Sequence, residues 1–422
     1  MNLRSLRLFA LIVWEYLKRN LIWVAGGVAV VIILAVLQVK LNLFYSPNLI
    51  RIGLIGTYQE HDLPRDITGL ASAGLVKADE SGRIKPNLVS GWEVNNDATE
   101  FKFELKENLK WVDNTSVKAS EIDFGIPNTS ISYPDERTIQ FKLKESYSPL
   151  PSLLMKPVFK KGTLLGIGPY KLTKIEKSRV FITKITLKGN SPELPDLQIR
   201  FYPNEKVAAV GFSLGEVQVL LGLANLKAIP KNPLVSVKQA TDYSKIVTIL
   251  YQTTDILLGN RSLRQALSYI APKIAGEEVA DNPYPPKFWA YNSDAKKYLS
   301  NPEEAESALE RAGSSLSEDK LQSELILTTT PNLEDAGKQI VKAWKTLGLD
   351  VKLRVESGIP QNFQALLITQ SIPIDPDQYF LWHATQTKTN LTKYDSKRVD
   401  KDLEDGRKII TEDERREKYF DF

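Results

Sequence analysis

The segment "PNLEDAGKQIVKAWKTLGLDVKLRVE" (residues 331–356) places a helical pattern directly before a strand pattern. Ile340 and Trp344 recur at the spacing of one helical face, and Gly348 supplies the stop that commonly follows a helix. "LDVKLRVE" (349–356) then has the apolar alternation of a strand. Alternation of this kind predicts an α/β lobe in which helices cover a sheet.

The segments before this one continue the same pattern. "NPEEAESALERAG" (301–313) offers Asn301 as N-cap, Pro302 at the first helical position and Gly313 after the end. "LLGNRSLRQALSYI" (257–270) is predicted as strand, cap and helix. The second half of the chain is therefore expected to be α/β.

The first half is predicted to be rich in strands. Four runs alternate or are rich in β-branched residues: "NLIRIGLIG" (48–56), "FKFELK" (101–106), "TIQFKLK" (138–144) and "VFITKITLKG" (180–189). A fifth, "KIVTILYQ" (245–252), precedes the helical half, and a charged helix over about 397–420 is predicted to close the chain. The fold class is therefore expected to be α/β with mixed sheets.

Residues 21–39, "LIWVAGGVAVVIILAVLQV", contain no charged side chain and are long enough for one transmembrane helix. A cleavable signal peptide is the main alternative, but its apolar core is usually shorter and ends at a small-residue cleavage site. Residues 1–20 carry a net charge of +3, so the positive-inside rule places this basic leader in the cytoplasm. We therefore expect a single-pass anchor with the bulk of the chain outside the cell.

Composition excludes several classes of function. The 422 residues carry a formal net charge of +4, of which the leader supplies +3, so the remainder shows no electrostatic footprint for nucleic acid. The absence of cysteine excludes disulfides, thiolate nucleophiles and a lipid-modified cysteine. About 380 residues outside the membrane are too many for one core, so two or more lobes are expected.

Catalytic and metal-binding patterns are also missing. The two histidines, His61 and His383, are far apart in sequence, which makes hydrogen-bonded residues more plausible than metal ligands. "GIGPY" (166–170) lacks the third glycine of a nucleotide-binding loop and is better read as a turn. Asp375 and Asp377 form a carboxylate pair, but adjacent Asp-Pro is typical of a turn. We expect no enzyme activity, no cofactor and no metal.

Several segments, in order, resemble the family 5 extracellular solute-binding proteins, the peptide- and nickel-binding subunits of ABC importers. Residues 73–114 are similar to the early signature of that family, with an alternating strand between Trp92 and Trp111. Both tryptophans are expected in a core. The match continues through "GIGPYKL" (166–172), "GFSLGEVQVL" (211–220), "NRSLRQALSYI", "NPYPPKFWAYNSDAKKY", "NPEEAESALERAG", "IDP" and "YDSKRVDKDLEDGRK".

The resemblance implies a two-lobed, periplasmic-binding-protein-like fold of type II, in which a hinge closes over a bound solute. The strand-rich lobe I would cover residues 48–245 and the α/β lobe II residues 246–422, with "KIVTILYQ" as the first hinge strand. It also implies no chemistry, which agrees with the missing catalytic groups. ABC permease subunits would be the partners.

The sequence departs from the family in three places. The long helical insertion that commonly follows "KASEID" (118–123) is absent. The family chain usually returns to the first lobe after the helix equivalent to "DERREKYFDF" (413–422), where this sequence stops, which leaves a single hinge as one alternative. Relatives that hold a peptide's amino terminus have an aspartate where this chain has Ile372, which puts ionic capture of that group in doubt.

The resemblance loosely suggests ligand contacts from two places. The loop after the first strand and the segment "ITQSI" would supply Glu60, His61, Asp62, Thr369, Gln370, Ser371 and Ile372. Ordinary loop and sheet roles for these residues are the alternative. The leading hypothesis is a membrane-tethered protein that captures peptides or similar small solutes for an ABC importer. The second is a ligand-sensing receptor or interaction ectodomain without a role in transport.

Overall fold

The computed structural model describes residues 48–60, 63–126, 129–223, 229 and 233–422. The predicted leader and transmembrane helix, residues 1–39, lie outside these ranges. Among the described residues, no helix combines the length and the apolar character needed to cross a bilayer. The chain divides into two compact units, residues 1–63 with 169–230, and residues 64–168 with 231–422.

This division differs from the predicted boundary at residue 245. Residues 64–168, expected in lobe I, group with the α/β half of the chain, so the first unit is smaller than the predicted lobe. The division into two lobes joined by a hinge stays a prediction.

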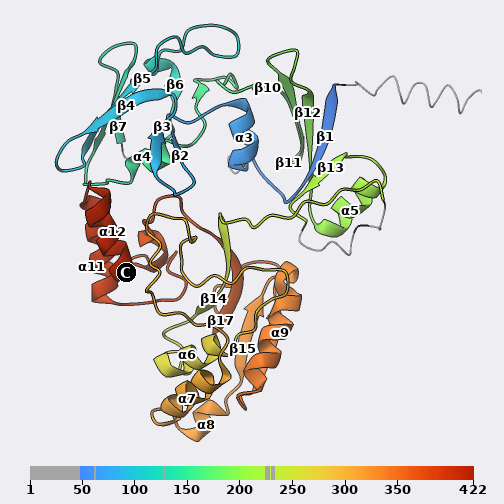
Figure 1. Ribbon diagram of the computed structural model, residues 1–422, viewed down its shortest axis with the longest axis vertical. Helices are drawn as coiled ribbons and strands as arrows, with labels where there is room; N and C mark the ends of the chain where they lie inside the picture. Colours follow the sequence, from blue (N-terminus) through green and yellow to red (C-terminus); the bar gives the residue numbers. More distant parts are fainter. Residues whose placement is uncertain (1–47, 61–62, 127–128, 224–228, 230–232) are drawn as a thin grey trace, which may run out of the picture. The chain divides into compact units, whose positions relative to one another are not determined.

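The first unit is built on a five-stranded sheet in the order β10-β11-β12-β1-β13 (Figure 1). The strands are β1 (Leu49–Ile55), β10 (Tyr170–Ser178), β11 (Phe181–Gly189), β12 (Asp196–Tyr202) and β13 (Val219–Leu221). Strand β1 runs parallel to β12 and β13, and α5 (Glu205–Ser213) connects these two partners. Apolar side chains alternate along β12, where Leu197, Ile199 and Phe201 are buried.

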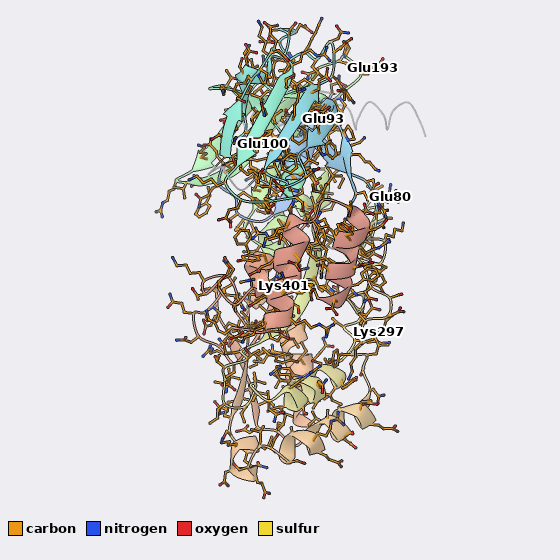
Figure 2. The ribbon with its side chains drawn as sticks, turned by 90° about the vertical axis from the view of Figure 1, so that its left-hand side faces the viewer. Glu80, Glu93, Glu100, Glu193, Lys297 and Lys401 are labelled. Atoms are coloured by element: carbon orange, nitrogen blue, oxygen red, sulfur yellow. The ribbon has the colours of Figure 1, made fainter. Side chains whose placement is uncertain are left out.

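Within the second unit, residues 64–168 surround an aromatic core. Its main sheet has the order β4-β5-β8-β7, with strands β4 (Val89–Val94), β5 (Glu100–Leu105), β7 (Thr129–Ser132) and β8 (Thr138–Leu143). Trp111 is buried as predicted, whereas Trp92 is half-buried and stacks on Phe103. On the outer face Glu93 and Glu100, labelled in Figure 2, pair with lysines.

Short elements complete this part of the unit. They are α3 (Arg65–Ala71), β2 (Val76–Ala78), β3 (Ile84–Pro86), η1 (Ala119–Glu121), β6 (Ile122–Asp123), α4 (Leu150–Leu153) and β9 (Phe159–Lys160). Gly166 and Gly168 pack against the main chain at Ala71, where an added Cβ would lie 2.1 and 2.5 Å from backbone atoms. The "GIGPY" segment is thus a close backbone contact, which glycine alone permits.

The rest of the second unit contains a sheet in the order β14-β17-β15-β16. Its strands are β14 (Lys245–Tyr251), β15 (Leu325–Thr329), β16 (Val351–Val355) and β17 (Ala365–Ser371). The helix predicted from residues 331–348 forms η3 (Pro331–Leu333) and α9 (Glu334–Lys345). Ile340 and Trp344 are buried against the sheet, and Gly337 allows the helix to approach Leu353. The predicted α/β arrangement is confirmed here.

The other helices are α6 (Arg261–Tyr269), α7 (Pro302–Gly313), α8 (Glu318–Leu321), α10 (Tyr379–Trp382), α11 (Lys397–Lys408) and α12 (Glu412–Asp421). The strand predicted at residues 257–259 is wrong. The Asp255 carboxylate accepts hydrogen bonds from the N–H groups of Leu257 and Leu258 and holds a turn there. The two leucines, whose apolar side chains suggested a strand, are buried in the core.

The single helix predicted over 397–420 is also wrong. Ile409 has extended dihedral angles, φ −72° and ψ 136°, and separates α11 from α12. Thr411 precedes α12, and its hydroxyl donates to the Glu414 carboxylate at 2.5 Å. Two helices therefore pack against each other where one was expected.

Candidate functional site

The carboxyl end of β17 carries Thr369, Gln370 and Ser371 and is followed by Ile372. This end pairs with the beginning of β14 in an antiparallel ladder. Ile372 donates its N–H to the carbonyl of Ser244 at 2.8 Å, which fixes the hydrogen-bonding phase of the ladder. Hydrogen-bonded and non-hydrogen-bonded pairs alternate in such a ladder, so Gln370 also directs its main chain toward β14.

Thr369 and Ser371 consequently direct their N–H and C=O groups to the opposite edge of β17. Strand β15 covers that edge only as far as Leu367. Beyond it, the main-chain groups of Thr369 and Ser371 have no backbone partner among the described residues. Both residues are exposed, so the end of β17 presents an open strand edge.

An open edge of this kind can bind an extended chain. Main-chain donors and acceptors pair with the backbone of a peptide whatever its side chains, which gives binding that tolerates many sequences. Gln370 and Ile372 are half-buried at the same end of the strand. Neither Thr369 nor Ser371 carries a charge, so the edge itself contributes no ionic preference.

The other predicted site residues do not all belong to this place. Glu60 lies in the first unit, where its carboxylate is 2.6 Å from Lys177 Nζ. His61 and Asp62 lie outside the described residues. The structure thus brings together residues 369–372, and the role of Glu60, His61 and Asp62 stays a prediction.

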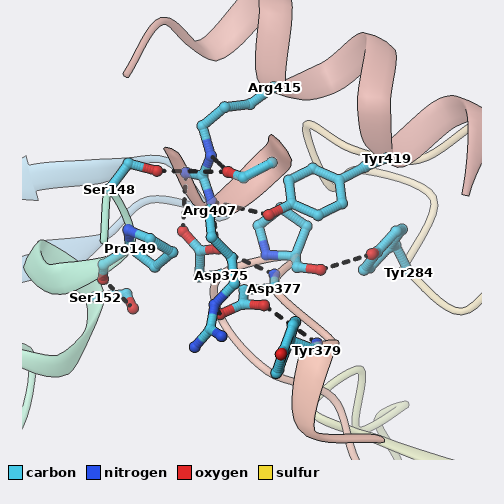
Figure 3. Close-up of polar contacts among 12 residues, drawn as sticks. Ser148, Pro149, Ser152, Tyr284, Asp375, Asp377, Tyr379, Arg407, Arg415 and Tyr419 are labelled. Atoms are coloured by element: carbon cyan, nitrogen blue, oxygen red, sulfur yellow. Dashed lines mark hydrogen bonds and ion pairs between the residues drawn. The ribbon is translucent and has the colours of Figure 1, made fainter. Parts of the chain in front are cut away.

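Two buried ion pairs fix the loop that follows β17 (Figure 3). Both oxygens of the Asp375 carboxylate accept hydrogen bonds from Arg415, at 2.6 and 3.1 Å. The Asp377 carboxylate is 3.0 Å from Arg407 Nε. The bidentate Asp375–Arg415 pair sets the geometry of the loop as well as its charge balance.

These pairs make the two aspartates structural. Burial raises the pKa of Asp377, while the Arg407 charge opposes that change. Burial disfavours the charged form of Arg415, but the Asp375 carboxylate outweighs it and raises the pKa of Arg415. Both carboxylates are paired with arginines, so the two aspartates offer no acid–base chemistry, as the turn interpretation predicted.

The same arginines attach residues 64–168 to the C-terminal helices. Ser148 donates its N–H to the carbonyl of Arg407 at 2.7 Å, and the Arg407 guanidinium lies over the ring of Tyr147. Arg83 pairs with Glu412 at 2.8 Å. A cavity of about 180 Å³ lies at this junction, but Arg83 and Arg415 on its wall already have carboxylate partners.

His383 is buried and hydrogen-bonded, as one of the alternatives from sequence predicted. Its Nε2 is 3.2 Å from a Glu404 oxygen and its Nδ1 is 2.8 Å from the Thr385 hydroxyl. In the part of the chain that the structure describes, no three His, Asp or Glu side chains are grouped closely enough to hold a metal ion.

Comparison with known proteins identifies the family. The family model described as bacterial extracellular solute-binding proteins, family 5, middle, matches residues 83–391. The chain belongs to this family. Proteins of this family are described as solute-binding proteins.

Curated relatives include a dipeptide-binding protein from Escherichia coli K12, 23% identical over 341 residues. This alignment covers 64% of the present family 5 protein and 63% of the relative. Oligopeptide-binding protein AppA from Bacillus subtilis 168 is 23% identical over 429 residues, which cover 83% and 78% of the two chains. The chain thus spans a little under two thirds of the dipeptide-binding protein.

Solved structures show the same fold. NikZ from Campylobacter jejuni, in complex with Ni(L-His), superposes with a TM-score of 0.72 at 20% identity, covering 89% of each chain. AppA from Bacillus subtilis, in complex with a nonapeptide, gives 0.66 at 20% identity, covering 88% of this chain and 89% of AppA. The periplasmic-binding-protein fold predicted from the sequence is confirmed.

The two arginines that pair with the loop after β17 were not predicted from the sequence. Arg407 and Arg415 lie in highly charged helices, where most charged side chains face solvent. The available signal was the position of each on the inner face of its helix, beside Leu403 and Tyr419, which are buried. Their acidic partners lie about 30 to 40 residues earlier and become neighbours only in the folded chain.

Proposed function

We propose that this family 5 protein captures short peptides in extended conformation and presents them to an ABC importer. The observation that carries the proposal is the unpaired edge of β17, where Thr369 and Ser371 offer main-chain donors and acceptors. Relatives described as dipeptide- and oligopeptide-binding support a peptide ligand. Other relatives are described as nickel- and heme-binding, so the ligand class needs a direct test.

Replacing Thr369 by proline tests the edge. The N–H of Thr369 points away from β14, so proline removes one outward donor without breaking a β14–β17 hydrogen bond. We expect the Thr369→Pro variant of the full chain to bind peptides at least tenfold more weakly by isothermal titration calorimetry. Thr369→Val keeps the N–H and is expected to bind as the wild type does.

A library of di- to pentapeptides supplies the ligands, and a nickel–histidine complex is titrated in parallel. Peptide binding that Thr369→Pro leaves unchanged would contradict the main-chain edge as the binding site. Binding of the nickel complex without any peptide would replace the proposed ligand class. Recovery of peptides with the purified chain by native mass spectrometry would support it.

We also propose that residues 21–39 remain as the membrane tether, with the ligand-binding part outside the cell. A tether raises the concentration of a binding protein near its permease, which is useful where a free protein would diffuse away. We expect the full chain to stay in the membrane fraction and to be digested by protease added to intact cells. Release of the protein into the medium after cleavage near residue 40 would contradict this.

A further inference from the structure

Strand β14 is the last strand at one end of its sheet. β17 pairs with one edge of β14, and the features described next lie at the other edge. Gln252 donates its N–H to the carbonyl of Gln364 at 2.8 Å, in the same ladder phase as Ile372 and Ser244. By alternation, Ile249 and Tyr251 direct their main-chain groups away from β17. No described strand pairs with β14 on that side.

A cavity of about 150 Å³ lies along this edge. Its wall consists of Thr248, Ile249, Leu250, Tyr251, Thr253, Arg264, Trp382, Thr392 and Tyr394. Helix α6 borders it through a contact of 3.3 Å between the hydroxyls of Tyr251 and Ser268 (Figure 1 shows α6 and β14).

Arg264 is the unusual residue of this wall. Its Nη1 donates to the carbonyls of Leu258 and Gly259, at 2.6 and 3.0 Å. Its Nε and Nη2 have no acceptor among the described residues, and the side chain is half-buried. Burial lowers the pKa of Arg264, and the other contributions come from three tyrosines and Arg261 rather than from a carboxylate.

The other partly or fully buried arginines described in the second unit are each within 4.0 Å of a carboxylate: Arg83, Arg137, Arg354, Arg407, Arg415 and Arg416. Arg264 departs from that pattern. A half-buried guanidinium without a counter-ion is costly, and a carboxylate that binds two of its N–H groups offsets the cost. The open donors therefore favour an anionic group in the cavity.

We propose that this cavity binds the C-terminal carboxylate of a short, extended peptide. The carboxylate pairs with Arg264, and the peptide main chain hydrogen-bonds to the outward groups of Ile249 and Tyr251. The last side chain of the peptide lies between Trp382 and Tyr394. The site is separate from the one proposed at Thr369 and Ser371, because the two use opposite edges of the β14–β17 pair.

The probe is acetyl-trialanine, as the free acid and as the C-terminal amide. Titration uses the full chain carrying Thr369→Pro, so that binding at the β17 edge is weakened and failure at one site is distinguished from failure at the other. We expect the acid to bind at least tenfold more tightly than the amide. Equal affinity for acid and amide would overturn the proposal.

Variants then locate the interaction. Arg264→Gln is expected to lower the affinity for the acid at least tenfold and to leave the amide unchanged. Arg261→Gln is the matched control, because Arg261 lies one turn earlier on α6, is exposed, and has no carboxylate within 4.0 Å among the described residues. Unchanged affinity of Arg264→Gln for the acid would overturn the proposal.

Ile249→Pro provides a test that does not depend on Arg264. It removes an outward N–H at a strand edge and leaves the hydrogen bonds to β17 in place. We expect it to weaken binding of both acid and amide. Acetate alone is expected to bind at least tenfold more weakly than the peptide acid, and equal binding would reduce the site to an anion site and overturn the peptide assignment.

Discussion

At the scale of single residues, the Asp375–Arg415 pair shows how this molecule uses charge. The two side chains are only 10% and 9% exposed, and Arg415 also donates to the carbonyl of Gly406. Such a pair stabilises the loop because the charge of each partner offsets the cost of burying the other. Removing one partner leaves a buried charge, which is more costly than the pair's net contribution suggests.

We expect Asp375→Asn to lower the free energy of unfolding by about 3–5 kcal/mol, because Arg415 would stay buried without its counter-ion. Urea unfolding measures the change. Asp413→Asn on α12, the helix of Arg415, is the control, since Asp413 is exposed and its pair with the partly buried Arg416 is expected to contribute less than about 1 kcal/mol. Similar losses in both variants would contradict this account.

Tyr147 gives a prediction for alkaline pH. Burial, followed by the charge of Asp377, raises its pKa to about 12. The unfolded chain releases this proton near pH 10, so folding stability is complete below pH 10 and is lost as the pH rises toward 12.

We therefore expect Tyr147→Phe to lose less stability than the wild type between pH 8 and pH 11, by about 1.4 kcal/mol. Urea unfolding at the two pH values gives the difference. Parallel loss in both proteins would show that this hydroxyl is not the titrating group.

Only some of these features of single residues could be predicted from the sequence. The Asp-Pro turn at residue 375 and the burial of Trp111 follow from local patterns and are confirmed. The partners of the turn could not be predicted, because Arg407 and Arg415 reach it only after two helices have docked. Thr369 and Ser371 were identified as candidates from the family resemblance, but the direction of their main-chain groups depends on the ladder phase.

At the scale of elements, local signals determine where helices begin. The Asn301 side chain accepts a hydrogen bond from the N–H of Glu304 at 3.3 Å and starts α7 where the sequence predicted. The break before α12 also had a signal, since Thr411 and Glu414 have the spacing of a capping box. The charge of the whole segment obscured it, because no glycine or proline marks the break.

We expect Asn301→Ala to lower the free energy of unfolding by about 1 kcal/mol, because α7 loses the acceptor at its first turn. Ser317→Ala is the matched control, since Ser317 precedes α8 but makes no capping hydrogen bond with its side chain. Thermal and urea unfolding compare the two variants. A loss for Ser317→Ala as large as that for Asn301→Ala would contradict the role of the cap.

At the scale of the whole molecule, each unit has its own core. Ile199 is fully buried in the sheet of the first unit, while Trp344 is fully buried in the second. The sequence predicted more than one lobe from chain length, and the sheets from alternation. It could not predict that residues 64–168 group with the second half, because that depends on contacts between distant segments.

We expect Ile199→Ala to destabilise the first unit by about 2–5 kcal/mol, because the change leaves a cavity in its core. Hydrogen exchange measured by segment should accelerate in β1, β11 and β12. Exchange in β14–β17 should change little. Uniform acceleration throughout the chain would show that the two cores unfold together.

The pairing of β1 has a consequence for synthesis. Leu49 lies beside Asp196, so β1, which lies between β12 and β13 in the sheet, leaves the ribosome 147 residues before its partner β12. At ~5–20 residues per second, the delay is about 7–30 s. Throughout that interval the nascent β1 has two unpaired edges and a largely apolar sequence, so it is a segment that a chaperone, or an export channel that keeps the chain extended, would protect from wrong pairing.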